Sequence, residues 1–210
     1  MIIEEVFKNN KKWVASKLEV DENYFTDLSK GQSPELLYIG CSDSRVTAEE
    51  LMGVEPGEAF VHRNIANMVI SIDLNAMSVI NYAINHLKVN HVVVCGHYGC
   101  GGVKAALETD NHGLIDNWLF HIKKSIRTHS KKLETVQGDK QVNLMCELNV
   151  IEQVNNVCHT TIVQEAWTHG IDVSVHGWIY GLEDGLIKDL QVSVSNNDEL
   201  AAMEENLYKE

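Results

Sequence analysis

Three things are missing from this sequence, and each absence narrows the kind of protein it encodes. It has no run of eighteen or more apolar residues, so we expect no transmembrane helix and no membrane partner. Residues 1–7 carry glutamates where a signal peptide needs a basic flank and an apolar run, which favours a cytoplasmic location. Only 2 prolines occur in 210 residues, and no Pro-, Gly- or Ser-rich linker interrupts them. We therefore expect one domain over residues 1–210.

Positive charge is also scarce. The chain has 17 basic and 30 acidic residues, which gives a formal net charge of −13. An acidic protein repels phosphate backbones, so we expect no nucleic-acid partner. Any anion that the protein handles must be held by local positive charge, by a metal or by helix N-termini.

The five cysteines are an odd number in a medium-sized chain, which argues against a disulfide framework. In a reducing compartment, each is a buried apolar residue, a metal ligand or a nucleophile. The question is which cysteine has which role.

The apolar pattern alternates between strands and helices, which predicts an α/β fold with a mostly parallel sheet flanked by helices. The expected strands are residues 36–41, 59–63, 91–95, 171–178 and 186–194, and the alternation of the last favours an antiparallel C-terminal edge strand. The expected helices are 2–18, 74–87, 101–108, 115–133 and 142–168, with a break near Cys158 and a cap at Gly170. We expect a helical N-terminal arm (1–30), which packs either on a partner subunit or on its own subunit, and an α/β core (35–195).

Two polar segments follow predicted strands: Cys41-Ser42-Asp43-Ser44-Arg45 and His97-Tyr98-Gly99-Cys100-Gly101-Gly102. Ligands of open parallel sheets bind beyond the carboxyl ends of the strands, where both segments lie. The first is not a cysteine phosphatase loop, because Thr47 stands where the arginine is needed. The second is not a P-loop, because Gly102 replaces the phosphate-binding lysine.

Cys41, His97 and Cys100 are the candidate metal ligands. Two cysteines and one histidine are the protein ligands of an open catalytic zinc site, in which water occupies the fourth position. Cys95 competes for this role but lies inside an apolar run, so we expect a buried thiol there. Cys146 and Cys158 also have apolar surroundings and are expected in the core. Zinc lowers the pKa of bound water to about 7, and the resulting hydroxide attacks carbon dioxide, an ester or an amide.

Asp43 and Arg45 are suited to direct such a nucleophile. A charge-assisted pair keeps the carboxylate ionised and oriented, so Asp43 can accept the proton of the zinc hydroxide. If Arg45 released it, Asp43 could instead become a fourth zinc ligand and close the site. The alternative is a structural salt bridge that supports the loop.

The pattern C-x-D-S-R followed by H-x2-C-G-G resembles the β-class carbonic anhydrases, and among them the bacterial members. The resemblance extends over most of the chain and includes residues 61–67, 95–103, 146–150 and 176–181. It implies a zinc enzyme that hydrates carbon dioxide reversibly to bicarbonate and a proton. Cys41, His97 and Cys100 would bind the zinc, and Asp43 and Arg45 would form the catalytic dyad.

The resemblance has further implications for assembly and for ligands. Gln32 and Tyr82 match positions that line the substrate pocket at a subunit interface. The N-terminal arm would wrap a partner in a homodimer, with two dimers paired into a tetramer. Some bacterial relatives bind a second, inhibitory bicarbonate on a tryptophan, an arginine and a tyrosine, which breaks the Asp–Arg pair.

Arg63 and Tyr180 match two of these three positions, and Tyr38 replaces the tryptophan. Allosteric inhibition by bicarbonate is therefore an expectation. Two other functions stay open at this point. One is a related zinc hydrolase acting on carbon disulfide or a small ester, and the other is a non-enzymatic bicarbonate or zinc sensor.

Overall fold

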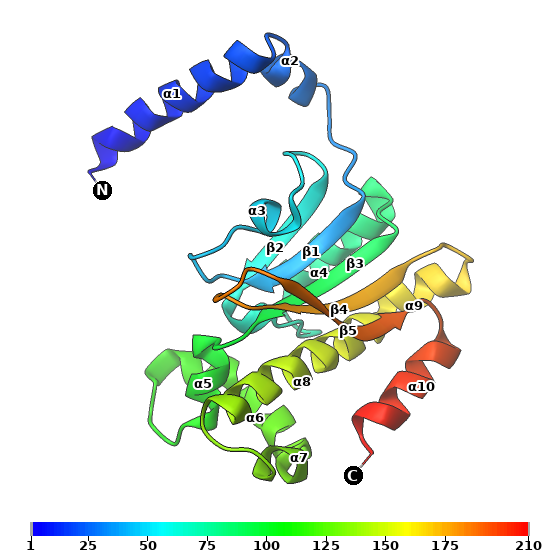
Figure 1. Ribbon diagram of the computed structural model, residues 1–210. Helices are drawn as coiled ribbons and strands as arrows, with labels where there is room; N and C mark the ends of the chain where they lie inside the picture. Colours follow the sequence, from blue (N-terminus) through cyan, green and yellow to red (C-terminus); the bar gives the residue numbers. More distant parts are fainter. Residues whose placement is uncertain (1, 210) are drawn as a thin grey trace. The chain divides into compact units, whose positions relative to one another are not determined.

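A single five-stranded sheet, in the order β2-β1-β3-β4-β5, forms the centre of the computed structural model, which describes residues 2–209 (Figure 1). β1 (Leu36–Cys41), β2 (Ala59–Asn64), β3 (His91–His97) and β4 (Ser174–Tyr180) are parallel. β5 (Ile187–Val194) runs antiparallel to β4 at the edge. The predicted fold class is confirmed.

The helices lie between and after these strands. Their bounds are α3 Ala48–Met52, η1 Ile65–Asn67, α4 Leu74–Asn81, η2 Tyr82–Leu87, α5 Gly101–Leu107, η3 Gly113–Ile115, α6 Asp116–Thr128, α7 Ser130–Glu134, α8 Asp139–Cys158, α9 Thr161–Thr168 and α10 Asn197–Leu207. The helix predicted over 115–133 is interrupted at His129, whose buried ring bonds Glu152 of α8 at 2.7 Å. The helix predicted over 142–168 ends at Cys158, and Thr160 caps α9. Gly170 is left-handed (φ 70°), one residue beyond the cap.

The two faces of the sheet have different partners. Leu37 and Ile39 of β1, with Val92 and Val94 of β3, pack in a core with α4, α8 and α9. The alternate residues of the same strands, including Tyr38, point to the other face of the sheet and pack with α3 in a smaller cluster. The period-two alternation of strand side chains produces this division.

α8 joins the sheet to the rest of the core. Eleven of its 20 residues are buried, and four of these are polar: Asn149, Glu152, Gln153 and Asn155. Val150 and Val154 pack in the sheet core, whereas Met145 and Leu148 pack with α5, α6 and α7 in a second core. α10 adds Leu200 and Leu207 to these cores, so the α/β unit continues past residue 195, where the predicted core ends.

Residues 2–33 and 34–209 are separate compact units. The first contains α1 (Ile3–Val20), in agreement with the predicted N-terminal helix, and a short α2 (Tyr24–Leu28), which was not predicted. No residue of α1 is buried, and apolar side chains such as Phe7 are exposed. None of the helices in residues 2–209 combines the length and the hydropathy needed to cross a membrane.

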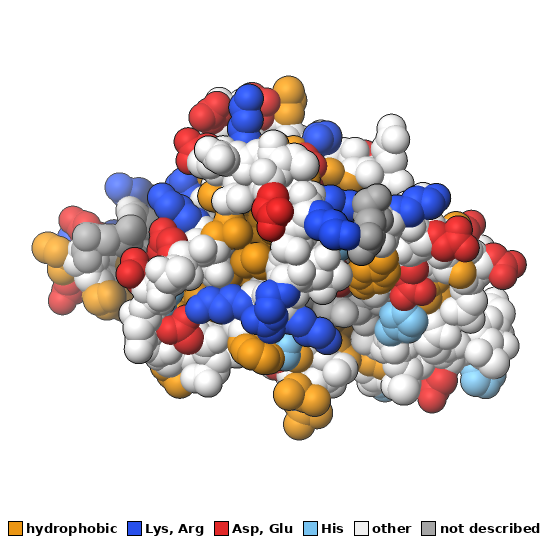
Figure 2. All heavy atoms as spheres, turned by 90° about the horizontal axis from the view of Figure 1, so that it is seen from below, with side chains coloured by type: hydrophobic (Ala, Val, Ile, Leu, Met, Phe, Trp, Pro, Cys, Tyr) orange, Lys and Arg blue, Asp and Glu red, His pale blue; other side chains and the backbone are white. Residues whose placement is uncertain are grey.

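Charge is distributed unevenly along the chain. Residues 117–133 contain five lysines and arginines and no acidic residue, although the net charge of the whole chain is −13. On the face shown in Figure 2, Lys and Arg side chains form a band between acidic groups. Local positive charge is therefore present on an acidic protein.

Gly96 lies where β3 passes close to Val150 of α8. A Cβ added there would lie 2.6 Å from Val150 Cγ2, and neither the strand nor the buried helix can move aside freely. We expect Gly96→Ala to lower the free energy of unfolding by about 1–3 kcal/mol, as overpacked cores do. Chemical denaturation of the variant and the parent measures this difference.

Gly101→Ala is the matched control, because a Cβ at residue 101 has no atom within 4 Å. We expect its free energy of unfolding to stay close to that of the parent. Equal stability of the two variants would contradict the close approach.

Candidate active site

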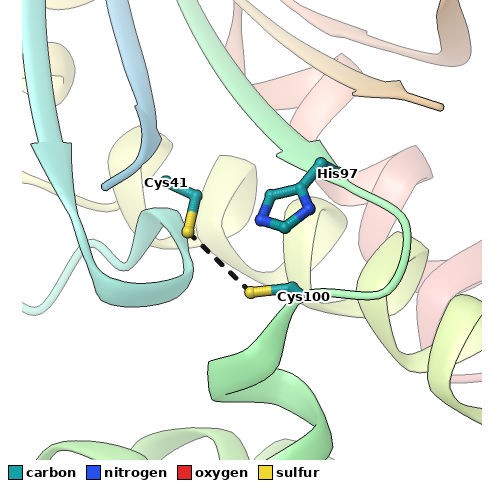
Figure 3. Close-up of side chains that lie close together, drawn as sticks. All are labelled: Cys41, His97 and Cys100. Atoms are coloured by element: carbon teal, nitrogen blue, oxygen red, sulfur yellow. Dashed lines mark hydrogen bonds between the residues drawn. The ribbon is translucent and has the colours of Figure 1, made fainter. Parts of the chain in front are cut away.

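The pairing of β1 with β3 brings the two polar segments together. Gly40 pairs with Cys95, so Cys41 and His97 both leave the sheet at its carboxyl edge. A left-handed Gly99 (φ 64°) then turns the chain back, so that Cys100 precedes α5. The side chains of Cys41, His97 and Cys100 point toward one another (Figure 3), and their ligand atoms all lie within 4.8 Å of each other.

These three side chains fit a tetrahedral metal ion. Zinc–sulfur bonds of about 2.3 Å at tetrahedral angles place two sulfurs about 3.8 Å apart. The Sγ atoms of Cys41 and Cys100 are 3.9 Å apart. His97 is fully buried and its Nδ1 lies 3.0 Å from the Tyr98 carbonyl oxygen, while its Nε2 has no hydrogen-bond partner. With Nδ1 donating, the Nε2 lone pair is free to bind a metal.

The two thiols form a hydrogen bond that shifts their pKa values in opposite directions. The hydrogen bond with Cys100 outweighs burial and lowers the pKa of Cys41 to about 4, with help from His97 and the Ala66 backbone. The same hydrogen bond, together with burial, raises the pKa of the Cys100 thiol far above its usual range. A metal bound by both sulfurs must therefore displace a proton.

The other cysteines lie outside this cluster. Burial raises the pKa of Cys95 to about 12, that of Cys146 to about 11 and that of Cys158 to about 12. Cys95 packs with Tyr38 on the sheet face next to α3. These three behave as buried thiols, as the sequence predicts.

Asp43 and Arg45 form a tight pair beside the ligand atoms. Arg45 donates from Nε to Oδ1 at 2.8 Å and from Nη2 to Oδ2 at 2.6 Å, and its backbone N–H reaches Oδ1 at 3.0 Å. These bonds hold the pKa of Asp43 well below its usual range, against a smaller opposing effect of burial. Asp43 Oδ2 is also 3.8 Å from His97 Nε2. An ionised carboxylate therefore faces the ligand cluster.

Arg63 holds the loop that carries this pair. Its Nε donates to the Cys41 carbonyl oxygen at 2.7 Å, and its Nη2 donates to the carbonyl oxygens of Val46 (3.0 Å) and Asp43. The loop is therefore fixed by bonds to its main chain. The sequence pointed to Arg63 only through the family resemblance.

Tyr38 and Tyr180, the other two residues of the predicted second bicarbonate site, are buried near Arg63. Both pack in the same cluster as Cys95, and each interacts electrostatically with Arg63. Burial raises the pKa of Tyr38 far above its usual range and that of Tyr180 to about 12. The structure thus brings these three side chains together.

The two predicted pocket residues are in different units. Tyr82 belongs to η2, is 46% exposed, and stacks on His86 with ring centroids 5.1 Å apart. Gln32 is exposed in the unit of residues 2–33. Their role at a substrate pocket stays a prediction.

Residue 66 is a site residue that the sequence reasoning missed. Ala66 has φ 63° and ψ 32°, a left-handed conformation that is uncommon without glycine. Its backbone contributes to the lowered pKa of Cys41, and its carbonyl oxygen accepts from Asn149 Nδ2 of α8 at 3.0 Å. The only sequence signal was that residues 66 and 149 belong to segments of the resemblance.

Comparison with known proteins agrees with this geometry. A family model described as carbonic anhydrase matches residues 36–187. A carbonic anhydrase from Emericella nidulans is 52% identical over 190 residues, which cover 90% of this chain and 83% of that protein. The Coccomyxa β-carbonic anhydrase in complex with acetazolamide has a TM-score of 0.92 at 37% identity, covering 99% of this chain and 96% of that one. A tetrameric β-carbonic anhydrase from Sordaria macrospora has a TM-score of 0.86 at 36% identity, covering 91% and 98%.

A metal-binding cluster of two cysteines and one histidine, at the carboxyl edge of a mostly parallel sheet, defines a class of metalloenzyme site. The chain belongs to the carbonic anhydrase family, in its β class. The 52% identity to a fungal member means that the expected similarity to the bacterial members is not confirmed.

We expect Cys41→Ala to abolish stoichiometric zinc binding, because it removes one of the three candidate ligands of the cluster. Cys158→Ala removes a thiol that is more deeply buried (0% exposed, against 9% for Cys41) from the far end of α8, and it should keep zinc. Metal analysis of the purified variants gives the zinc content per chain. Full zinc content in Cys41→Ala would contradict the assignment.

Proposed function

We propose that this protein catalyses the reversible hydration of carbon dioxide to bicarbonate and a proton, with zinc as its resident metal. The observation that carries the proposal is the convergence of three ligand atoms with an ionised carboxylate 3.8 Å from His97 Nε2. Cys41, His97 and Cys100 would hold the zinc. When bound, zinc is a Lewis acid that makes a nucleophile available from water at neutral pH.

Asp43 and Arg45 supply the orientation that the reaction needs. Asp43 is kept ionised by Arg45, so it can only accept hydrogen bonds. A water molecule beside His97 Nε2 would donate to this carboxylate, and its lone pair would then face the carbon of carbon dioxide. Arg45 is a positioning residue here, because its guanidinium holds both oxygens of the Asp43 carboxylate, each by one hydrogen bond.

The structure offers support for an oligomer as well. α1 exposes apolar side chains and buries none, as a helix that packs on a partner subunit would. Relatives from Sordaria macrospora are described as tetrameric. We therefore propose a homodimer that pairs into a tetramer. Gln32 and Tyr82 would line the substrate pocket at a subunit interface. The proposed location of the protein is the cytoplasm. Sedimentation velocity of the full chain tests the assembly.

We expect Asp43→Asn to lower kcat for carbon dioxide hydration at least about 100-fold, since it removes the charged acceptor, while the zinc content stays at one per chain. Stopped-flow hydration of carbon dioxide on zinc-quantified protein measures this change. Asp116→Asn is the control, because Asp116 is also an ion-paired carboxylate, bonded to Lys123 at 2.9 Å. An unchanged rate in Asp43→Asn would reduce the pair to a loop support.

A substrate panel separates this activity from a related hydrolase. Carbon disulfide and a small ester are assayed beside carbon dioxide on the same preparation. Turnover of either one with no hydration of carbon dioxide would overturn the proposal.

Inhibition by a second bicarbonate is the regulatory part of the proposal, and would act by releasing Asp43 from Arg45 onto the metal. Its support is that Tyr38, Arg63 and Tyr180 lie together beside the loop that carries the pair. We expect added bicarbonate to lower the hydration rate of the parent, and Tyr38→Phe to weaken this inhibition because it removes one hydrogen-bonding hydroxyl. Initial rates at fixed pH and rising bicarbonate test it, and identical inhibition in both proteins would contradict a role for Tyr38.

A further inference from the structure

The ring orientation of the candidate ligand His97 depends on the next residue, Tyr98. The His97 Nδ1 atom lies 3.0 Å from the carbonyl oxygen of Tyr98. In metal sites, the hydrogen bond on the distal ring nitrogen fixes the tautomer and the orientation of the ring, and its loss costs metal affinity. The position of the Tyr98 carbonyl oxygen therefore influences how well His97 can bind a metal.

Three bonds hold residue 98 in place. Its backbone N–H donates to the carbonyl oxygen of Tyr180, at the end of β4, at 3.0 Å. Its phenol donates to Glu147 Oε1 of α8. Lys188 Nζ of β5 donates to the same carboxylate oxygen at 2.8 Å and lies 3.4 Å from the phenol oxygen.

Together these bonds attach the short loop between His97 and Cys100 to α8. Asn143, one turn before Glu147 on α8, accepts from the Gly99 N–H at 3.1 Å. The two residues between the ligands His97 and Cys100 are thus each bonded to α8. The hydrogen bond with Glu147 raises the pKa of Lys188, which agrees with a charge-assisted pair.

The group formed by Tyr98, Glu147 and Lys188 lies at the border of the site rather than within it. Tyr98 and Lys188 line a cavity of about 770 Å³ that Arg45 and Gly99 also line. The Lys188 side chain is 58% exposed and that of Glu147 is 26% exposed. An exposed pair of this kind contributes little to global stability, so stability alone does not explain its position.

We propose that Glu147 and Lys188 are positioning residues for His97, and that they act through the Tyr98 phenol and carbonyl. Glu147 holds the phenol, Lys188 holds the Glu147 carboxylate, and residue 98 then presents its carbonyl oxygen to Nδ1. Nε2 is kept facing the sulfurs of Cys41 and Cys100. The inference rests on the proposed function, because it takes the metal of that site as its object.

The test measures zinc affinity directly, by competition between the folded protein and a chromogenic zinc chelator at fixed pH. We expect Tyr98→Phe and Glu147→Leu to raise the Kd for zinc by about 10-fold, the lower end of the range for losing a direct outer partner, because the Tyr98 carbonyl itself remains. Glu147→Gln keeps an acceptor for the phenol and should restore the Kd to within about 3-fold of the parent. Lys188→Met should give a smaller rise than Glu147→Leu.

Tyr208→Phe is the matched control. The Tyr208 phenol also donates to a glutamate of α8, Glu152, at 3.3 Å, but this pair contacts no candidate ligand. Lys123→Met removes a comparable lysine, paired with Asp116 at 2.9 Å. Both controls should leave the Kd for zinc unchanged.

A second measurement separates positioning from a general loss of structure. Cobalt(II) replaces zinc in the parent and in Tyr98→Phe, and its visible absorption reports the ligand geometry. We expect the bands of Tyr98→Phe to shift while the controls overlay the parent. A Kd within 2-fold of the parent and an unshifted spectrum in Tyr98→Phe and Glu147→Leu would overturn the inference.

Failure of the inference and failure of the proposed function give different results. If the parent binds zinc with the expected variant pattern but does not hydrate carbon dioxide, the positioning role stands and the function fails. If the parent hydrates carbon dioxide and the variants bind zinc as it does, the function stands and the positioning role fails.

Discussion

The parallel pairing of β1 with β3 is the constraint on which the site depends. Because the strands are neighbours and run in the same direction, Cys41 and His97 emerge at the same edge of the sheet, and the turn at Gly99 needs only a few residues to return Cys100 to them. No long loop has to be ordered to assemble the three ligands. The conformational entropy of bringing the ligands together is therefore lost mainly when the sheet forms.

α8 positions the residues at this edge of the sheet more closely than strand pairing alone does. Its apolar residues fix its distance from the sheet, to the extent that Gly96 cannot carry a side chain without a clash. Its polar residues also bond main-chain atoms near the site, through Asn143 to Gly99 of the second segment and through Asn149 to Ala66 of η1. The same helix thus supplies the packing and the orientation, so a change in one is felt by the other.

The sequence was sufficient for the strands, the fold class and the cluster of Cys41, His97 and Cys100, since these depend on local periodicity and on chemistry at strand ends. It could not separate the helix over 115–133 into two, because the residue at the interruption, His129, bonds a glutamate that is distant in the sequence. The loop contacts of Arg63 were equally out of reach, because their acceptors are backbone carbonyls that any residue provides. Long-range bonds to the main chain leave no pattern in side-chain types.

The left-handed turn at Ala66 has a consequence for how this protein can change. Non-glycine residues in such conformations cost about 1–3 kcal/mol each, and Asn67 beside it is also left-handed. Glycine at residue 66 would relieve that cost, yet it would remove a fully buried methyl group and loosen the backbone beside Cys41. The relieved strain and the lost packing are of similar size and opposite sign, so they largely cancel in the free energy of unfolding. What the alanine secures is the conformation of the backbone beside a candidate ligand, more than stability.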